Sequence, residues 1–369
     1  MSAKLLRAGD IDEAFRAEWR ALADTPAELT NPYFLPWFLE PAIALLDGAG
    51  AVRLLTIRDE GRLIGLAPVT RGETYAKAPL RHFEIWRHHH FYTGAPLIVA
   101  GAKDAFYKAL LSWLDERPEG ARFFRFTQTP PIGALARALQ SRAVIVESQG
   151  ERAVLAGGRP FETVYGEIFT GRRRKNLRRL WRRFGETGDL RFERLTDPQS
   201  VAAAAAFYVA FEKQGWKGRE DDALPVGRSE AEARFFLEAA RKGAEAGAVL
   251  VDQAVLDGEP VAMLFSLRAG ASLATWKTSF SERHAIYSPG VQLMIEATRL
   301  MLEDASIALL DSCARPDHPV ADHIWRGRMR VSTLNVAASG AANGAAIAAA
   351  EKAGRALART KERLKRVTP

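Results

Sequence analysis

Two stretches of the chain follow the same hairpin pattern. "LTIRDEGRLIGLAPVTRG" (55–72) and "QAVLDGEPVAMLFSLRAG" (253–270) each place a turn with an acidic residue between two apolar-rich runs. This is the pattern of two antiparallel strands joined by a short turn. Around each hairpin we expect the same order of elements: two helices, an antiparallel meander, a helix and a further strand. The repeated order predicts an α/β unit that occurs twice in tandem.

Apolar periodicity predicts the individual elements. In the first half we expect helices at 10–22, 35–47 and 104–116, and strands at 51–58, 62–70, 80–87 and "ARFFRFT" (121–127). In the second half we expect helices at 200–213, 229–242 and 290–304, and strands at 190–195, 248–256, 260–268, 272–280 and "IALLD" (307–311).

The length of 369 residues suits two domains, because domains usually hold about 100–200 residues. We expect domains at 1–155 and 160–337, joined by the segment 145–170, and an Ala-rich basic helical tail at 338–369. No apolar run approaches the roughly 20 residues of a membrane span, and the amphipathic N-terminus does not resemble a signal peptide. The one cysteine, Cys313, excludes internal disulfides and fits a reducing compartment, so we expect a cytoplasmic protein.

The excess positive charge belongs to one element. The net charge is +8, and "GRRRKNLRRLWRRF" (171–184) holds eight basic residues and no acid. Leu177, Leu180, Trp181 and Phe184 form an apolar stripe at helical spacing, which predicts a helix with one packed face and a cationic remainder. Three interpretations are open: the cations bind an acidic acceptor or the phosphates of a ligand, they form only a solvated face, or they bind nucleic acid. The aromatic residues lie on the packing stripe, which disfavours single-strand binding.

The segment Ser288-Pro289-Gly290 opens the helix expected at 290–304. Ser288 suits the N-cap, since its hydroxyl can accept a bond from a free backbone N–H. Pro289 suits the first helical position, and Gly290 lets another molecule approach the backbone. A helix N-terminus of this kind favours an anion such as a pyrophosphate. The alternative is a well-capped helix with no ligand.

Three segments together resemble the acetyltransferase-like domain of the CelD/BcsL family, which belongs to the GNAT superfamily and is related to the FemAB-like proteins. They are "RRRKNLRRLWRRFGETGDLRFERL" (172–195), "LATWKTSFSERHAIYSPGVQLMIEA" (273–297) and "LLDSCARPDHPVADHIWRGRMRV" (309–331). The resemblance covers about 160–335, and the first half resembles the degenerate partner of a double GNAT fold. The resemblance implies two tandem GNAT-like domains, each with a mixed, mostly antiparallel sheet flanked by helices.

The resemblance implies acyl transfer from acetyl-CoA, or another acyl-CoA, to an amine or hydroxyl. In GNAT enzymes two central strands splay around the pantetheine arm, and the pyrophosphate lies at the next helix N-terminus. The resemblance therefore assigns donor binding to Trp276 and Lys277 of the aromatic strand and to Ser288, Pro289, Gly290, Val291 and Gln292. The first half has "FYTGAPLIVAGAKDAFY" (91–107) at the matching place and lacks the Ser-Pro-Gly step. We therefore expect one donor site per chain.

Acyl transfer requires a base, donors for the oxyanion and an acid for the leaving thiolate. Backbone N–H groups of strand 272–280 are candidates for the thioester carbonyl, and Tyr287 for protonating the thiolate. Asp311 is a candidate to act as the base or to orient the acceptor. His318 is a second candidate base, since the His pKa near 6.5 suits neutral pH. Each has a structural alternative: Tyr287 packs, Asp311 caps a loop, or His318 is solvated.

We expect acceptor binding from the cationic helix, through Arg174 and Arg178, from Trp216 and Lys217 of "KQGWKGR" (213–219), and from Trp325 and Arg328. Arg326 or Arg328 is also a candidate for a CoA phosphate. Many relatives carry a Tyr-Lys pair after the aspartate strand, whereas this chain has "DHPVADHIWRGRMR". A lysine-dependent step carried over from the FemAB-like relatives is therefore in doubt.

The histidines of "RHHH" (87–90) alternate between the two faces of a strand, which disfavours a shared metal site. We expect no metal. A lone cysteine such as Cys313 is more often inert than nucleophilic.

The sequence thus leaves three functional hypotheses. The first is an acyl-CoA-dependent acyltransferase that acts on a small-molecule or saccharide acceptor, in envelope or exopolysaccharide metabolism if the family is followed. The second is a FemAB-like aminoacyl transferase, for which tRNA would be the nucleic-acid partner. The third is a non-catalytic binding protein with a decayed site.

Overall fold

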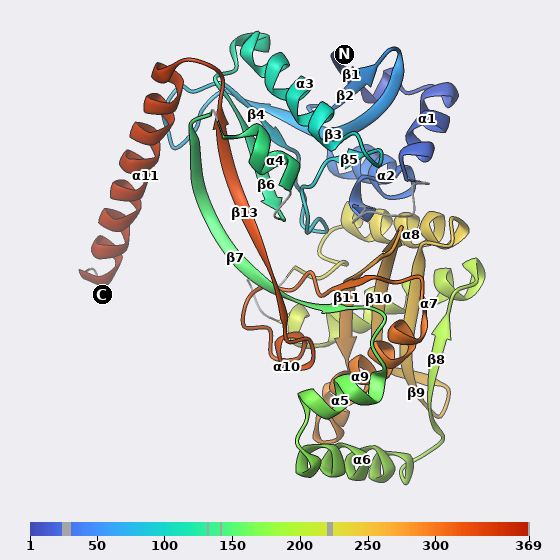
Figure 1. The fold of residues 1–369 in the computed structure, drawn as a ribbon. Helices are drawn as coiled ribbons and strands as arrows, with labels where there is room; N and C mark the ends of the chain where they lie inside the picture. The colour runs from blue at the N-terminus through green and yellow to red at the C-terminus, as the bar shows by residue number, and fades with distance from the viewer. Residues whose placement is uncertain (24–30, 131–132, 141, 220–223, 368–369) are drawn as a thin grey trace. The chain divides into compact units, whose positions relative to one another are not determined.

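The computed structural model describes residues 1–23, 31–130, 133–140, 142–219 and 224–367, with side chains described up to residue 357 (Figure 1). The chain divides into two compact units that are not contiguous in sequence. Unit 1 comprises Met1–Leu22, Ala49–Gly150 and Arg330–Pro369, and unit 2 comprises Ala23–Gly48 and Glu151–Met329. The expected borders at 155 and 337 differ from this division, because the segment 23–48 belongs to unit 2 and the segment from Arg330 onward belongs to unit 1.

The sheet of unit 1 has the strand order β1-β2-β3-β4-β6-β13, with β5 paired to β3. All these neighbours are antiparallel except β4 and β6, which are parallel. The strands are β1 (Ser2–Arg7), β2 (Arg53–Asp59), β3 (Arg62–Gly72), β4 (His82–Ile85), β5 (Leu97–Ile98), β6 (Phe123–Thr129) and β13 (Gly327–Ala337). The helices are η1 (Ala8–Asp10), α1 (Glu13–Ala23), α3 (Lys103–Asp115), η3 (Pro118–Gly120), α4 (Gly133–Ala138) and α11 (Ala341–Val367).

The helical tail expected from its Ala-rich composition is α11. Its Ile347 is fully buried in a cluster with Tyr75 and Phe123. The start of α11 therefore docks on the core of unit 1.

The sheet of unit 2 has the strand order β7-β12-β11-β10-β9-β8. β11 and β12 are parallel, and the other neighbours are antiparallel. The strands are β7 (Val144–Ala156), β8 (Leu190–Leu195), β9 (Val249–Leu256), β10 (Glu259–Ala269), β11 (Ser272–Phe280) and β12 (Leu309–Asp311). The helices are η2 (Pro32–Phe34), α2 (Pro36–Leu46), α5 (Phe161–Ile168), α6 (Gly171–Gly185), α7 (Pro198–Gln214), η4 (Trp216–Gly218), α8 (Glu230–Glu245), η5 (Glu282–Tyr287), α9 (Pro289–Glu303) and α10 (Ala321–Ile324).

The tandem order predicted from the two hairpins is confirmed, and it extends further than the sequence indicated. The short 3-10 helices, β5, the helices α5 and α6 between the halves, and the terminal α11 lie outside the repeat. Without them, each half runs strand, two helices, three antiparallel strands, helix, strand, short helix, strand. The expected joining segment 145–170 holds β7 and α5. The closing strands are exchanged: β7 of the first half pairs with β12 in unit 2, and β13 of the second half pairs with β6 in unit 1.

The sheet of unit 2 is covered on both faces. Consecutive residues of a strand point to opposite faces, and Leu264 and Phe265 of β10 are both buried. Leu264 belongs to a core formed with α5, α6, α9 and α10. Phe265 packs against Tyr208 of α7 and Phe236 of α8. The helix that follows β11 and the cationic helix α6 therefore share one face.

Candidate functional site

The two parallel strands of unit 2 separate soon after they meet. β11 and β12 pair only from Ser272 and Leu309 to Ala274 and Asp311. β11 continues to Phe280 alongside β10, and the chain after Asp311 leaves the sheet. From Thr275 to Phe280, the edge of β11 that faces away from β10 has no strand partner among the described residues. The sheet therefore offers unpaired backbone along this part of β11.

A β-bulge lies at the start of this unpaired stretch. The register with β10 passes from Lys277 directly to Thr275, so Trp276 has no partner on β10. Such bulges bend a strand and are common beside active sites. The bulge at Trp276 thus lies two residues after Ala274, where the parallel pairing ends.

Helix α9 begins at Pro289, as the sequence predicts, but Ser288 does not cap it through its hydroxyl. Ser288 is in the left-handed conformation (φ 56°, ψ 49°) and makes no side-chain cap bond, so that expectation was wrong. Its backbone oxygen instead accepts from the N–H groups of Val291 and Gln292, both at 3.1 Å. Within the part of the chain that is described, the N–H of Gly290 donates to no acceptor. One free amide therefore remains at the positive end of the helix dipole.

Gly290 stands at a close approach to β11. A Cβ atom at this position would lie 3.2 Å from Cδ1 of Phe280. Gly290 itself is half-buried, so the amide end of α9 is open to a ligand on one side.

Two residues near the mouth of α9 fix the cationic helix α6 in place. The Gln292 side chain donates from Nε2 to the carbonyl oxygen of Leu177 at 2.7 Å. The Tyr287 ring stacks on Phe184 with the centroids 4.6 Å apart and the planes 10° apart. Gln292 and Tyr287, which the resemblance assigned to the donor and to acid catalysis, thus hold α6 beside the helix mouth.

A pocket of about 370 Å³ lies beside the first turn of α9. Arg173 of α6 and Arg326 bring positive charge to it, and Asp322 of α10 brings a carboxylate. Asp322 Oδ1 is buried and has no hydrogen-bond partner in the described structure. The other lining residues are Ile168, Phe169, Val291, Pro319, Val320, His323 and Ile324.

The pocket includes two residues that sequence analysis missed. Val291 was expected at a donor site and Arg326 was considered for a phosphate, but Arg173 and Asp322 were not singled out. Arg173 is one of eight similar cations, and only its position on the edge of the apolar stripe distinguishes it. Nothing in the local sequence distinguishes Asp322 from the neighbouring Asp317.

Lys217 contacts the unpaired stretch of β11. Its Nζ donates to the backbone oxygen of Thr278 at 2.8 Å and to Glu212 Oε1 at 2.6 Å. Burial lowers the pKa of Lys217, the Glu212 carboxylate opposes this, and the nearby Lys277 lowers the pKa further. Trp216, which is 37% exposed, lies with its ring centroid 5.9 Å from the same Nζ.

His318 lies close enough to Lys217 for the lysine charge to act on it. Its Nδ1 accepts from the N–H groups of Val320 at 3.3 Å and Ala321 at 3.1 Å. Burial lowers the pKa of His318, Asp322 opposes this, and Lys217 lowers it further. A neutral ring that accepts at Nδ1 carries its proton on Nε2. His318 is therefore arranged as a hydrogen-bond donor at Nε2.

Asp311 is engaged in a buried ion pair. Its Oδ2 accepts from Arg152 Nη2 at 2.5 Å, and its Oδ1 accepts from the backbone N–H of Cys313 at 2.9 Å. The Tyr33 hydroxyl donates to Cys313 Sγ at 3.4 Å. Burial, and next the Asp311 carboxylate, raise the pKa of the Cys313 thiol to about 12. Asp311 therefore orders the turn after β12, and the thiol stays protonated near neutral pH.

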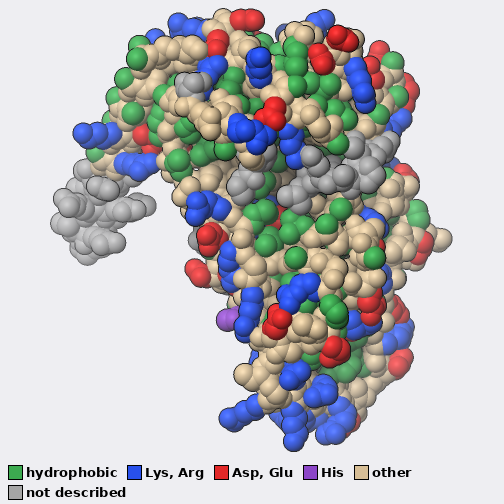
Figure 2. Space-filling model, in the orientation of Figure 1, with side chains coloured by type: hydrophobic (Ala, Val, Ile, Leu, Met, Phe, Trp, Pro, Cys, Tyr) green, Lys and Arg blue, Asp and Glu red, His purple; other side chains and the backbone are tan. Residues whose placement is uncertain are grey.

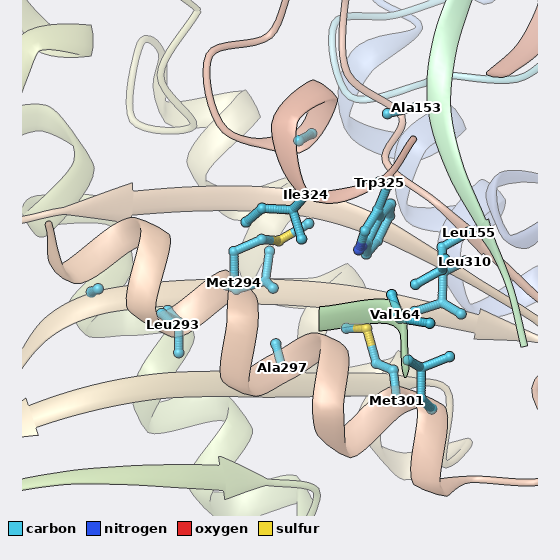
Figure 3. Packing of buried hydrophobic residues seen from close by; sticks show 14 of the residues in the cluster. Ala153, Leu155, Val164, Leu293, Met294, Ala297, Met301, Leu310, Ile324 and Trp325 are labelled. Atoms are coloured by element: carbon cyan, nitrogen blue, oxygen red, sulfur yellow. The ribbon is translucent and has the colours of Figure 1, made fainter. Parts of the chain in front are cut away.

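Three side chains expected to bind ligands have other contacts. Trp325 is fully buried, and its indole N–H donates to Thr298 Oγ1 at 3.0 Å (Figure 3). Trp276 is 4% exposed and packs on Phe38 at 5.5 Å. The Arg328 guanidinium donates to the backbone oxygens of Asp322, Trp325 and Gly327. The role of these three side chains in ligand binding stays a prediction.

The other expected cations are placed as follows. The Arg174 guanidinium lies 6.0 Å from the Tyr165 ring centroid. Arg178 is exposed on α6, and Lys277 is buried on β11. No group of three or more His, Cys, Asp or Glu side chains in the described residues could hold a metal ion. Among the described helices, none combines the length and apolar content that crossing a bilayer requires.

Comparison with known proteins agrees with this geometry. Residues 171–318 match a family model described as an acetyltransferase (GNAT) domain, which spans α6 to His318. No curated protein sequence matches the chain significantly.

Solved structures match over almost the whole chain at low identity. FemX is 12% identical, with a TM-score of 0.55 over 91% of this chain and 97% of FemX. A conserved protein of unknown function from Bacteroides thetaiotaomicron is 12% identical, with a TM-score of 0.57 over 87% of this chain and 97% of that one. L-PGS from Bacillus licheniformis is 12% identical, with a TM-score of 0.52 over 92% of this chain and 96% of that one. The chain therefore has the two-domain GNAT fold, and its residues 171–318 are similar to the acetyltransferase (GNAT) domain model.

Proposed function

We propose that the chain is an acyltransferase that moves an acetyl or related acyl group from acyl-CoA to an amine or hydroxyl of an acceptor. One observation carries the proposal: β11 and β12 separate after Ala274 and Asp311, beside the open amide end of α9. The pantetheine arm is an extended chain with two amides. It can pair with the unpaired edge of β11 as an added strand would.

The donor's charged end has a set of partners at the mouth of α9. The free N–H of Gly290 and the helix dipole favour a pyrophosphate. Arg173 and Arg326 in the adjoining pocket can pair with phosphate oxygens. The unpartnered Asp322 Oδ1 can accept from a ribose hydroxyl or an adenine amino group. The pocket thus suits a ligand that carries both phosphates and hydrogen-bond donors.

The transfer itself needs few groups. The acceptor nitrogen or oxygen attacks the thioester carbonyl carbon and gives up its proton to water. The C–S bond then breaks and the CoA thiolate takes up a proton, so the products are the acylated acceptor and free CoA thiol. We assign the Nε2–H of His318 to the developing charge on the thioester, and we keep Tyr287 as the candidate acid for the thiolate. Lys217 stays the candidate for contacting the acceptor, and Asp311 acts as a positioning residue through the turn after β12.

A second candidate is a FemAB-like aminoacyl transferase that takes its donor from aminoacyl-tRNA. The likeness to FemX in fold supports it, and so do the exposed cations of α6. The acceptor class in envelope or exopolysaccharide metabolism follows only from the CelD/BcsL resemblance.

Calorimetric titration of the full chain with acetyl-CoA tests the first candidate. Gly290→Glu places a carboxylate at the proposed pyrophosphate site, where like charges about 4 Å apart repel by up to about 4 kcal/mol at an effective dielectric of 20. We expect acetyl-CoA affinity to fall at least 30-fold. Gly290→Gln is the matched control, because it has the same size and displaces the Phe280 ring equally, and it should lose much less. Arg326→Gln should lose about tenfold.

The three hypotheses give different titrations. Acetyl-CoA binding that Gly290→Glu does not weaken more than Gly290→Gln contradicts the proposed donor site. Binding of aminoacyl-tRNA without acetyl-CoA binding favours the second candidate. Binding of neither favours a protein whose site has decayed.

A further inference from the structure

We propose that the exposed face of α6 docks the protein on an anionic phospholipid bilayer. We call this surface the cationic face and define it by Arg172, Lys175, Arg178, Arg179, Arg182 and Arg183, all of which are exposed. In Figure 2 the Lys and Arg side chains gather at the bottom of the view, where Figure 1 places α6. This inference does not depend on which acyl donor the protein uses.

The six cations form one stripe along the helix. At 100° per residue they fall within an arc of about 140°, centred opposite the apolar stripe of Leu177, Trp181 and Phe184. The helix has 15 residues, so the stripe follows an axis roughly 22 Å long. A straight row of exposed positive charge can meet a flat anionic surface along its whole length.

The cationic face is not neutralised by the protein. Among the described residues, one acid lies within 4 Å of any of the six cations: Glu186, whose carboxylate is 3.8 Å from Arg182. Arg179 donates to the Asn176 side chain. Exposed arginines elsewhere in unit 2, such as Arg191 and Arg219, pair with carboxylates at 2.5–2.8 Å. The charge of α6 is therefore available to a partner.

The face is held on a fixed support. Leu177 and Phe184 are buried, and Gln292 of α9 donates to the Leu177 carbonyl. The Trp181 ring stacks on Phe192 of β8 with the centroids 4.0 Å apart. Because α6 is ordered before any partner arrives, docking costs little conformational entropy.

An anionic bilayer fits this surface better than a single-stranded nucleic acid does. The aromatic residues of α6 face the core, and stacking on bases is what single-strand binding uses. Ile286 of η5 is 74% exposed, and η5 contacts the end of α6 through His284, whose ring lies 5.1 Å from Phe184. Arg283 of the same turn is also exposed. Clustered, exposed Lys and Arg side chains suit the surface of anionic lipids.

Co-sedimentation of the full chain with vesicles tests the proposal. The probes are vesicles of phosphatidylcholine alone and of phosphatidylcholine with 30% phosphatidylglycerol. The test variant is Arg172→Gln/Arg179→Gln/Arg183→Gln. The matched control is Arg191→Gln/Arg219→Gln/Arg241→Gln, which removes three exposed arginines of unit 2 that are paired with acids.

We expect the parent chain to bind the phosphatidylglycerol vesicles, and 0.5 M salt to release it. Each basic residue near such a surface changes binding about fivefold, so the test variant should bind about 100-fold more weakly. The control variant should bind within a few-fold of the parent. Ile286→Ser should weaken binding up to about tenfold, and Leu224→Ser, which also removes an exposed aliphatic side chain, should not.

Three results would overturn the proposal. The first is no binding to phosphatidylglycerol vesicles at low salt. The second is equal loss in the test and control variants. The third is a mixed tRNA sample that binds more tightly than the vesicles and depends on the same three arginines, which would make the cationic face a nucleic-acid surface.

Discussion

Asp311→Asn separates a positioning role of this carboxylate from a role as catalytic base. Asparagine keeps the volume, and its oxygen can still accept from the Cys313 N–H. The substitution removes the Asp311 charge from its ion pair with the Arg152 guanidinium, which is 6% exposed. At a separation of about 4 Å between the charge centres, the Coulomb attraction is about 4 kcal/mol at an effective dielectric of 20. Removing one partner of a buried ion pair typically costs about 3–5 kcal/mol, so we expect unfolding to become easier by about that amount.

Urea unfolding, followed by tryptophan fluorescence and circular dichroism, measures this loss. With a slope of about 2 kcal/mol/M, the midpoint of unit 2 should fall by about 1.5–2.5 M. The double variant Arg152→Met/Asp311→Leu should recover much of the stability, because replacing both members of a buried pair with apolar groups is often neutral. Acetyl-CoA titration of both variants then reports on the site itself.

The reasoning is refuted if Asp311→Asn unfolds within about 0.5 M urea of the parent. The same holds if the double variant is less stable than the single one. A stable Asp311→Asn chain that binds acetyl-CoA normally and transfers no acyl group would identify the carboxylate as the base.

Two further predictions concern titratable groups near the site. The Cys313 thiol, with its pKa raised to about 12, should react with an aromatic disulfide reagent at pH 8 about 1,000-fold more slowly in the folded chain than in urea. Equal rates would contradict the raised pKa of this thiol beside Asp311. Burial lowers the pKa of His318, so the unfolded chain binds more protons at this residue than the folded chain does. The stability that His318 contributes is therefore present above about pH 6.5 and is lost as the pH falls towards the pKa of the folded state. His318→Asn should therefore lose less stability than the parent between pH 7.5 and pH 5, as measured by urea midpoints, and parallel losses would show that His318 titrates normally.

Local pattern was sufficient to predict most of the fold. The apolar stripe of α6 faces inward, as its spacing indicated, because Leu177 and Phe184 recur at the helical period. The hairpin strands appear as β2 with β3 and as β9 with β10. These features depend on neighbours in sequence, which is the information that periodicity carries.

The site depends on partners that are distant in sequence. Arg152 and Asp311 are 159 residues apart, and neither has a local signal for the other. The pocket joins Arg173 to Asp322 and Arg326 in the same way. Ser288 failed as a side-chain cap because the turn from η5 places it in a left-handed conformation, which residue type alone does not reveal.

The exchange of β7 and β13 has a consequence for expressing the halves separately. A fragment that ends near residue 156 would carry β7 away from β12 and would leave β6 without β13. The complementary fragment would present bare strand edges where those neighbours belong, which invites aggregation. Neither fragment is therefore a self-sufficient domain, and mixing the two should restore a folded protein only when each recovers its strand from the other.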